Sequence, residues 1–146
     1  MIPTPAETLA AYVRAFETLR AEDVVPFYLL PCAFIRPDGA WIVQDPPAAL
    51  VLVNHMMEHA VAQGYRSTAI TRLATRSLAP TLAELTGDFE RYDAAGQPIG
   101  RFGFTYILRE VSGHWKIVVA IAHDPASAPE PPQALSGNPG RDTPLS

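Results

Sequence analysis

The sequence predicts an α+β fold in which helices cover one face of a mainly antiparallel sheet. Two observations lead to this prediction. Before Gly64 the apolar residues recur mostly at helical spacing, whereas from Arg66 onward they alternate as they do in long β-strands. Helices and strands are therefore segregated along the chain, which is typical of an α+β fold and not of a parallel α/β sheet.

Three helices are expected in the first part of the chain. Thr4 and Glu7 form a capping box that opens the first helix. Asp23 caps a short second helix that ends near Pro31, and Asp45 opens the third. The helical residues expected to face inward are Leu9, Tyr12, Val13, Phe16 and Leu19 in the first helix and Leu50, Val53, Met57 and Val61 in the third.

A small hairpin and four long strands complete the predicted fold. The hairpin joins residues 32–36 to residues 40–44, and Asp38 lies in its Pro-Asp-Gly turn. We expect the long strands to pair in sequence as a meander. They span roughly residues 66–77, 82–92, 99–110 and 114–123.

Side-chain alternation sorts the residues of the meander onto two faces of the sheet. Pairing about Ala79 places Arg72 opposite Thr86. The charged face, expected to point outward, carries Arg72, Arg76, Glu84, Asp88, Glu90, Arg101, Arg109 and Lys116. The apolar face, expected to lie under the helices, carries Thr71, Leu73, Leu85, Phe89, Phe102, Phe104, Tyr106, Leu108, Trp115, Ile117, Val119, Ile121 and His123. A curved sheet of this kind can enclose an apolar cavity with a few polar groups, here Thr71, Tyr106, His123 and Tyr12 of the first helix.

The chain is expected to form one folded domain, residues 1–124, and a flexible proline-rich tail, residues 125–146. A chain of 146 residues can bury roughly 68–70% of the surface that it exposes when unfolded, which is enough for one core. Six of its 15 prolines lie in the last 22 residues, mixed with serine and glycine. That composition is typical of a linker or loose end.

Composition excludes several kinds of partner and location. The 11 basic and 15 acidic residues give a net charge of −4 and leave no basic stripe, so nucleic acid is not an expected partner. No stretch reaches the roughly 20 apolar residues of a membrane-spanning helix, and the N-terminus is unlike a signal peptide. The single cysteine cannot form an intrachain disulfide. We therefore expect a cytoplasmic protein without a membrane partner.

Three short strings resemble the nuclear-transport-factor-2-like superfamily, in its SnoaL-like and ketosteroid-isomerase-like branch. They are Tyr-Val-Arg-Ala-Phe at 12–16 with Asp23 after it, Ala-Phe-Ile-Arg-Pro-Asp at 33–38, and Gly-His-Trp-Lys-Ile-Val at 113–118. Together with the element order, the resemblance covers about residues 7–123. It implies a cystatin-like, cone-shaped roll with three N-terminal helices packed on a curved sheet. It also implies a homodimer through the outer sheet face, an expectation that sedimentation velocity can measure.

The resemblance also suggests site residues, and it argues against one activity. Ketosteroid isomerases use an aspartate base on the first strand, with a tyrosine and a protonated aspartic acid as oxyanion donors. Tyr12 matches the tyrosine position, but Asp38 lies one residue beyond the expected base, where this chain has Pro37. The segment 103–106 contains no carboxylate to supply the second acid. Polyketide cyclases are similar in placing acid or base groups near the last strands, where this chain has His123.

The candidate catalytic residues are accordingly Tyr12, Asp38 and His123. An unperturbed histidine has a pKa near 6.5, which suits His123 to proton transfer at neutral pH. The candidate ligand-binding residues are Trp41, Thr71, Phe89, Phe104, Tyr106 and Trp115. Each of these residues could instead have a purely structural role, as a core aromatic, a turn residue or a residue at the edge of the sheet.

Three further features, a zinc-like motif, a cysteine and an arginine, each allow a functional and a structural interpretation. His55, Glu58 and His59 match an H-x-x-E-H zinc motif, but they fall opposite the apolar stripe of their helix, so a solvated stripe is expected and no metal. Cys32 has no helix N-terminus or base beside it and is not expected to be a nucleophile. Arg91 shares the inner-face parity near a strand end, where it could meet an anion or be a solvated terminus.

Three functional hypotheses remain open from the sequence. The first is a cofactor-free lyase, isomerase or cyclase acting on an apolar carbonyl compound, with His123 or Asp38 moving the proton and a tyrosine stabilising the oxyanion. The second is a noncatalytic module that binds a small apolar molecule. The third is a dimeric scaffold whose interior is filled by its own side chains.

Overall fold

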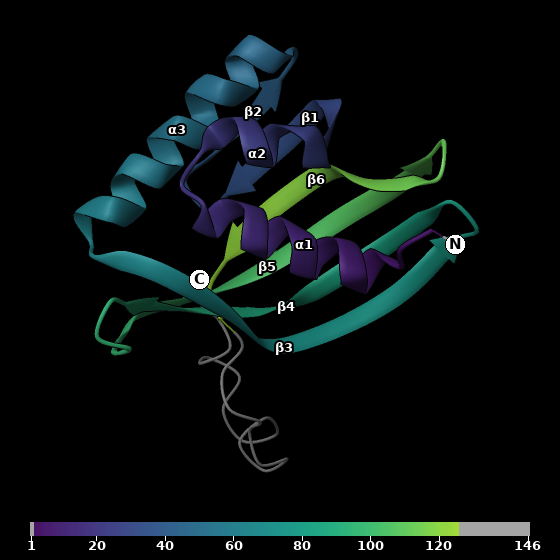
Figure 1. The fold of residues 1–146 in the computed structure, drawn as a ribbon. Coiled ribbons are helices and arrows are strands. Elements are labelled where there is room, and N and C mark those ends of the chain that lie inside the picture. Colours follow the sequence, from purple (N-terminus) through teal and green to yellow (C-terminus); the bar gives the residue numbers. More distant parts are fainter. Residues whose placement is uncertain (1, 126–146) are drawn as a thin grey trace, which may run out of the picture.

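Three α-helices and a 3₁₀ turn lie on one face of a curved six-stranded sheet in the computed structural model, which describes residues 2–125 (Figure 1). The helical elements are α1 (Pro5–Glu17), α2 (Ala21–Val24), η1 (Val25–Phe27) and α3 (Pro46–Ala62). The strands are β1 (Tyr28–Arg36), β2 (Gly39–Val43), β3 (Tyr65–Ala79), β4 (Leu82–Asp93), β5 (Pro98–Val111) and β6 (His114–His123). The predicted α+β class is confirmed, and the predicted tail lies, apart from Pro125, outside the described residues.

The predicted hairpin belongs to the main sheet. The strand order is β2-β1-β6-β5-β4-β3, so the meander of β3 to β6 is extended by β1, which pairs with β6 in parallel. The other neighbouring strands are antiparallel. This parallel pairing joins segments that are far apart in sequence, which is why periodicity alone did not reveal it.

The second helix is shorter than predicted and has no side-chain cap. It begins at Ala21, with Asp23 inside its first turn, and passes into η1. Tyr28 is already a strand residue and pairs with Ile117 of β6. The predicted end near Pro31 was therefore wrong, because pairing with β6 overrides the local helical pattern.

α1 and α3 have the N-caps that the sequence predicts. The Glu7 amide donates to Thr4 Oγ1 at 3.1 Å and the Thr4 amide donates to Glu7 Oε1 at 2.9 Å, which is the predicted capping box. The Ala48 amide donates to Asp45 Oδ1 at 3.0 Å. These bonds satisfy amides that have no partner inside the helix.

The buried stripes of the helices differ from prediction at two positions. Leu19 is 37% exposed because it follows the end of α1, and Val61 is 52% exposed. On α3 the buried residues are Ala49, Val53, Met57 and Ala60, a stripe at helical spacing that includes two alanines. Small side chains were overlooked because alanine carries little hydrophobic signal.

Two irregularities in the sheet change the predicted faces. On β3 a register shift between Ile70 and Arg72 pairs Arg72 with Asp88 instead of Thr86, and Thr71 is exposed. On β6 Ile117 pairs with Leu108 but Val119 pairs with Ile107, so Val118 is an extra residue. A bulge reverses the alternation of every residue beyond it. Val119, Ile121 and His123 therefore point outward, contrary to prediction.

The outer face carries the predicted ladder of opposite charges. Arg72 Nε lies 3.0 Å and Arg101 Nη2 3.8 Å from Asp88 Oδ2, and Arg76 Nε lies 3.1 Å from Glu84 Oε1. Glu90 and Arg101, both on the predicted charged face, are also paired across β4 and β5. The predicted homodimer through this face stays a prediction.

Gly87 on β4 is required by close packing on both sides. A Cβ at this position would lie 1.9 Å from the Arg72 carbonyl oxygen and 2.9 Å from Phe104 Cζ. We expect Gly87→Ala to lower the free energy of unfolding by about 3 kcal/mol, since overpacking against backbone cannot relax cheaply. At Gly100 of β5 nothing lies within 4 Å of an added Cβ. Urea unfolding of Gly87→Ala and Gly100→Ala checks this, and equal midpoints would contradict it.

Candidate functional site

The interior between α1 and the sheet holds a cluster of three tyrosines. Tyr12 of α1, Tyr28 of β1 and Tyr106 of β5 are all buried. The hydroxyl oxygens of Tyr12 and Tyr28 lie 2.6 Å apart and share a hydrogen bond. The Tyr12 ring meets the rings of Tyr28 and Tyr106 edge to face, at centroid distances of 5.8 and 5.9 Å. We call these three residues the tyrosine cluster.

The electrostatics of the tyrosine cluster favour the protonated phenols. Burial raises the pKa of Tyr12 well above its usual range, and the neighbouring Tyr28 raises it further. Burial likewise raises the pKa of Tyr28 and of Tyr106. Within residues 2–125, no carboxylate or imidazole is hydrogen-bonded to the Tyr12–Tyr28 pair. The cluster can donate hydrogen bonds, but it contains no group that accepts a proton at neutral pH.

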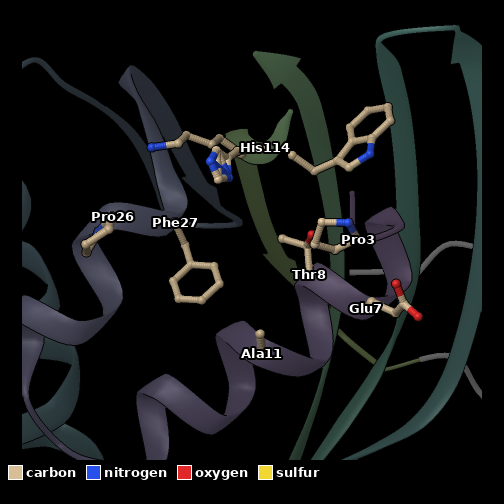
Figure 2. Close-up of a pocket in the computed structure, with 9 residues that line it drawn as sticks. Pro3, Glu7, Thr8, Ala11, Pro26, Phe27 and His114 are labelled. Atoms are coloured by element: carbon tan, nitrogen blue, oxygen red, sulfur yellow. The ribbon is translucent and has the colours of Figure 1, made fainter. Parts of the chain in front are cut away.

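A cleft of about 420 Å³ opens between the N-terminal half of α1, η1 and the start of β6. Figure 2 shows the Phe27 ring projecting between η1 and α1, on the side of Thr8 and Ala11. We call this cavity the α1–β6 cleft. The residues that line it are Pro3, Glu7, Thr8, Ala11, Pro26, Phe27, His114, Trp115 and Lys116.

Phe27 connects the α1–β6 cleft to the tyrosine cluster. Its ring lines the cleft and also meets the Tyr12 ring edge to face, at a centroid distance of 5.7 Å. Phe27 and Trp115 supply aromatic surface, whereas His114 and Lys116 supply hydrogen-bond donors. Glu7 is engaged by the backbone of Thr4 in the capping box. The cleft therefore combines apolar walls with a few polar groups, as small-molecule sites do.

Three of the nine predicted site residues lie in these two regions. Tyr12 and Tyr106 belong to the tyrosine cluster, and Trp115 lines the α1–β6 cleft. Phe89 and Phe104 are buried core residues whose rings stack at 4.3 Å, and Phe104 also packs against Tyr106. The aromatic wall that the sequence predicted is therefore present, and much of it is packed against itself.

The other predicted site residues lie elsewhere. Asp38 is in the exposed β1–β2 turn, where Arg36 Nε lies 3.4 Å from its carboxylate, and Trp41 is 44% exposed under the same arginine. Thr71 is the extra residue of the β3 shift and donates to the Asp88 carbonyl at 3.4 Å. The expected inward orientation was therefore wrong for Thr71, and the roles proposed for Asp38 and Trp41 stay predictions.

His123 is on the outer face of the sheet. Its Nε2 lies 3.0 Å from Thr105 Oγ1, which in turn lies 3.0 Å from Thr86 Oγ1. Its Nδ1 lies 2.8 Å from the Asp124 carbonyl, and its ring covers Gly103. The predicted inward orientation was wrong because the β6 bulge lies between His123 and the residues that set the parity.

The sequence did not identify Phe27, Tyr28 or His114 as site residues. Phe27 and Tyr28 were assigned to a helix that ends earlier, so their directions could not be derived. Pro31 restricts only the residue before it, so no local signal places Phe27 and Tyr28. The sequence places His114 at the start of the last strand but gives it no role in a site.

The zinc-like motif on α3 is solvent-exposed. His55, Glu58 and His59 are exposed, and His59 Nε2 lies 3.4 Å from Gln63 Nε2. Across residues 2–125, no group of three or more metal-ligating side chains could hold an ion. Cys32 is buried, and burial raises its pKa to about 12, so it is a neutral thiol at physiological pH.

A family model matches residues 6–125, and its description is NTF2-like protein (DUF6841). The chain belongs to this NTF2-like family. No protein with a curated description matches it. The match covers all the described secondary structure except the first residue of α1. The NTF2-like resemblance inferred from the sequence is thus confirmed.

Several solved structures share the NTF2-like fold. A candidate calcium/calmodulin-dependent protein kinase type II association domain from Thiobacillus denitrificans has a TM-score of 0.68 at 19% identity, covering 87% of this chain and 98% of that one. An NTF2-like protein with a cystatin-like fold from Novosphingobium aromaticivorans has a TM-score of 0.65 at 12% identity, covering 88% and 84%. A candidate scytalone dehydratase from the same organism has a TM-score of 0.62 at 12% identity, covering 86% and 92%.

These structural likenesses establish the cystatin-like fold of this NTF2-like protein. At such identities they carry no function across, because one fold can hold unrelated sites. Among the helices of residues 2–125, none has the length and apolar character needed to cross a membrane.

The Tyr12–Tyr28 hydrogen bond has a testable energetic consequence. We expect Tyr12→Phe and Tyr28→Phe each to lower the free energy of unfolding by about 1–3 kcal/mol, because each leaves a buried hydroxyl without this partner. The double variant should cost less than the sum of the two. Tyr92→Phe is the control, since Tyr92 bonds Glu90 outside the cluster. Additive losses in urea unfolding would contradict the pairing.

The raised pKa values of the tyrosine cluster predict alkaline destabilisation. The folded protein holds the phenolic protons to higher pH than the unfolded chain, whose tyrosines titrate near pH 10. The contribution of these tyrosines to the free energy of unfolding should therefore be constant below about pH 10 and fall above it. Absorbance at the tyrosinate band should rise together with loss of circular dichroism. Gradual ionisation of all five tyrosines in a folded protein would contradict this.

Proposed function

We propose that this NTF2-like protein binds a small apolar molecule in the α1–β6 cleft without transforming it. The observation that carries the proposal is the cleft itself, whose aromatic wall, Phe27, is continuous with the tyrosine cluster. A volume of about 420 Å³ falls within the roughly 300–1,000 Å³ typical of small-molecule sites. His114 and Lys116 at the start of β6 would orient a ligand carbonyl by donating hydrogen bonds.

Binding is favoured over catalysis because no carboxylate or imidazole among residues 2–125 is hydrogen-bonded to the Tyr12–Tyr28 pair. A proton-transfer enzyme needs an acceptor within about 2.6–3.2 Å of the proton that it removes. Asp38 is in solvent with a side chain that is 72% exposed, and His123 points away from the interior. The tyrosines have raised pKa values and remain donors at neutral pH. This combination supports a recognition site.

One observation favours a second candidate, the cofactor-free lyase or isomerase acting on an apolar carbonyl compound. The paired hydroxyls of Tyr12 and Tyr28, 2.6 Å apart, resemble the donor arrangement that stabilises a developing oxyanion. His114 in the cleft lining would then have to act as the base. A fold neighbour that is a candidate scytalone dehydratase is consistent with lyase chemistry on this fold. Chemical conversion of a bound compound would favour this candidate over simple binding.

The two tryptophans provide a direct test of binding in the cleft. Trp41→Phe leaves Trp115, which lines the cleft, as the sole indole, and Trp115→Phe leaves Trp41, which lies outside the lining. Titration with 2-acetylnaphthalene, an apolar aromatic ketone, should quench the Trp115-only protein saturably and the Trp41-only protein only in proportion to concentration. Saturable quenching of Trp41 alone would contradict the proposed place of binding.

A matched pair of α1 variants controls for indirect effects. Ala11 lines the cleft, whereas its exposed neighbour Ala10 does not. In the Trp41→Phe background, Ala11→Leu should weaken binding by at least about tenfold, because the added side chain occupies ligand space. Ala10→Leu should leave affinity unchanged. Equal affinities for the two variants would refute the cleft as the binding site.

A further inference from the structure

Arg91 of β4 places a guanidinium group among aromatic rings on the inner face of the sheet. Its Cζ lies 5.2 Å from the Phe16 ring centroid, 5.2 Å from that of Tyr65 and 4.9 Å from that of Phe102. These rings come from α1, β3 and β5. We call Phe16, Tyr65 and Phe102 the aromatic cage.

The guanidinium has no anionic partner within residues 2–125. No carboxylate of the described chain is in an ion pair with Arg91, whereas Arg72 and Arg101 both lie against Asp88. Arg91 Nε is buried and donates no hydrogen bond, the one such side-chain nitrogen or oxygen among the described residues. Buried charged groups are normally paired, so this exception calls for a cause.

The aromatic cage stabilises the charge of the Arg91 guanidinium but does not satisfy its hydrogen-bond donors. Cation–π contacts stabilise the positive charge over the faces of the rings. They do not satisfy the N–H donors, which lie in the plane of the guanidinium and need acceptors at its edge. Burial accordingly lowers the pKa of Arg91, although nearby Tyr65 partly counteracts the shift. The Arg91 cation therefore lies in a partly dehydrated place, and its Nε–H has no acceptor among the described residues.

We infer that Arg91 binds the carboxylate of a small aromatic or otherwise apolar acid. A carboxylate is planar and presents two oxygens that match the guanidinium edge. One cation suits a monoanion better than a phosphate dianion, which would bring a second uncompensated charge among Phe16, Tyr65 and Phe102. The rings would pack against the apolar part of the acid. The half-buried side chain of Arg91 leaves access from solvent.

This carboxylate site is separate from the α1–β6 cleft. Arg91 and the cage are absent from the cleft lining, and Phe16 lies more than one helical turn beyond Ala11 on α1. The tyrosine cluster contacts both regions, since Tyr12 meets Phe27 of the cleft, and Tyr106 meets Phe89, which packs against Phe102 of the cage. The inference therefore does not depend on ligand binding in the cleft.

The first experiment follows the NMR signal of Arg91 Nε–H, the donor that has no acceptor among the described residues. Sodium benzoate is titrated into the ¹⁵N-labelled wild-type protein, and the arginine Nε–H signals are followed by NMR at slightly acidic pH. We expect one signal, absent from the Arg91→Lys variant, to shift saturably with benzoate. Benzamide, a neutral molecule of the same shape, should leave it unmoved. Equal shifts with benzamide, or with inorganic phosphate, would overturn the assignment to a carboxylate.

Variants then separate recognition from a purely structural role. Arg91→Met removes the charge at similar length and should weaken benzoate binding by at least about tenfold, as expected for loss of a charged hydrogen bond. Its Tm without benzoate should equal or exceed that of the wild type, because an unpaired buried cation is removed. Arg109→Met is the matched control, since Arg109 is exposed on the outer face of β5.

Two results would refute the carboxylate site. One is unchanged benzoate affinity in Arg91→Met, and the other is equal loss in Arg109→Met. If Arg91→Met does not fold, the comparison of benzoate with benzamide on the wild-type protein decides the question alone. Ala11→Leu in the cleft should leave benzoate affinity unchanged, so failure here is distinct from failure of the proposed function.

Discussion

The exclusion of water from the inner face of the sheet is the constraint on which the other features of this protein depend. α1 covers that face with an apolar stripe, and the aromatic residues of β4 and β5 fill the space beneath it. A polar group in such a place must find a partner in the protein or in a ligand. Tyr12 and Tyr28 satisfy each other at 2.6 Å, whereas Arg91 Nε finds no partner among the described residues.

The contrast between the two faces of the sheet follows from the same constraint. On the outer face, partly solvated arginines lie against Asp88 and Glu84, and three polar side chains are linked from Thr86 through Thr105 to His123. The charges of Arg72, Arg76 and Arg101 are thus balanced within the chain. On the inner face, no carboxylate among residues 2–125 forms an ion pair with Arg91, and the hydroxyls of the tyrosine cluster are neutral. The chemistry available for a ligand is therefore on the inner face and at its edges, where the α1–β6 cleft opens.

Within residues 2–125, the polar groups of the inner face include the phenols of the tyrosine cluster and the guanidinium of Arg91. The NTF2-like scaffold provides a curved sheet, a covering helix and an opening at the end of α1, and it does not determine which side chains occupy them. In this chain those positions hold tyrosines, phenylalanines and one arginine. Such a set offers hydrogen-bond donors and one positive charge. Asp38 and His123, the proton carriers that the sequence suggests, lie in solvent and on the outer face, and His114 lines the α1–β6 cleft.

Local signals in the sequence determined the element order, two helix caps and most of the core. The capping box of Thr4 and Glu7 and the cap at Asp45 depend on neighbours within three residues, so they could be read directly. The pairing of β3 to β6 follows from short connections, and alternation alone placed Glu90 and Arg101 on the same face. The candidate residues Tyr12, Tyr106 and Trp115 were found because they lie on strongly periodic segments.

Only the tertiary structure decided which polar groups meet inside. The parallel pairing of β1 with β6 moved Tyr28 out of a helix and brought it to Tyr12, sixteen positions earlier. The extra residue at Val118 turned His123 outward, and the shift at Thr71 brought Arg72 to Asp88. Alternation propagates along a strand, so one inserted residue reverses all that follow, and no local signal marks where the insertion falls. Long-range pairing likewise has no signature in neighbouring residues, because it depends on surfaces that exist only once the chain has folded.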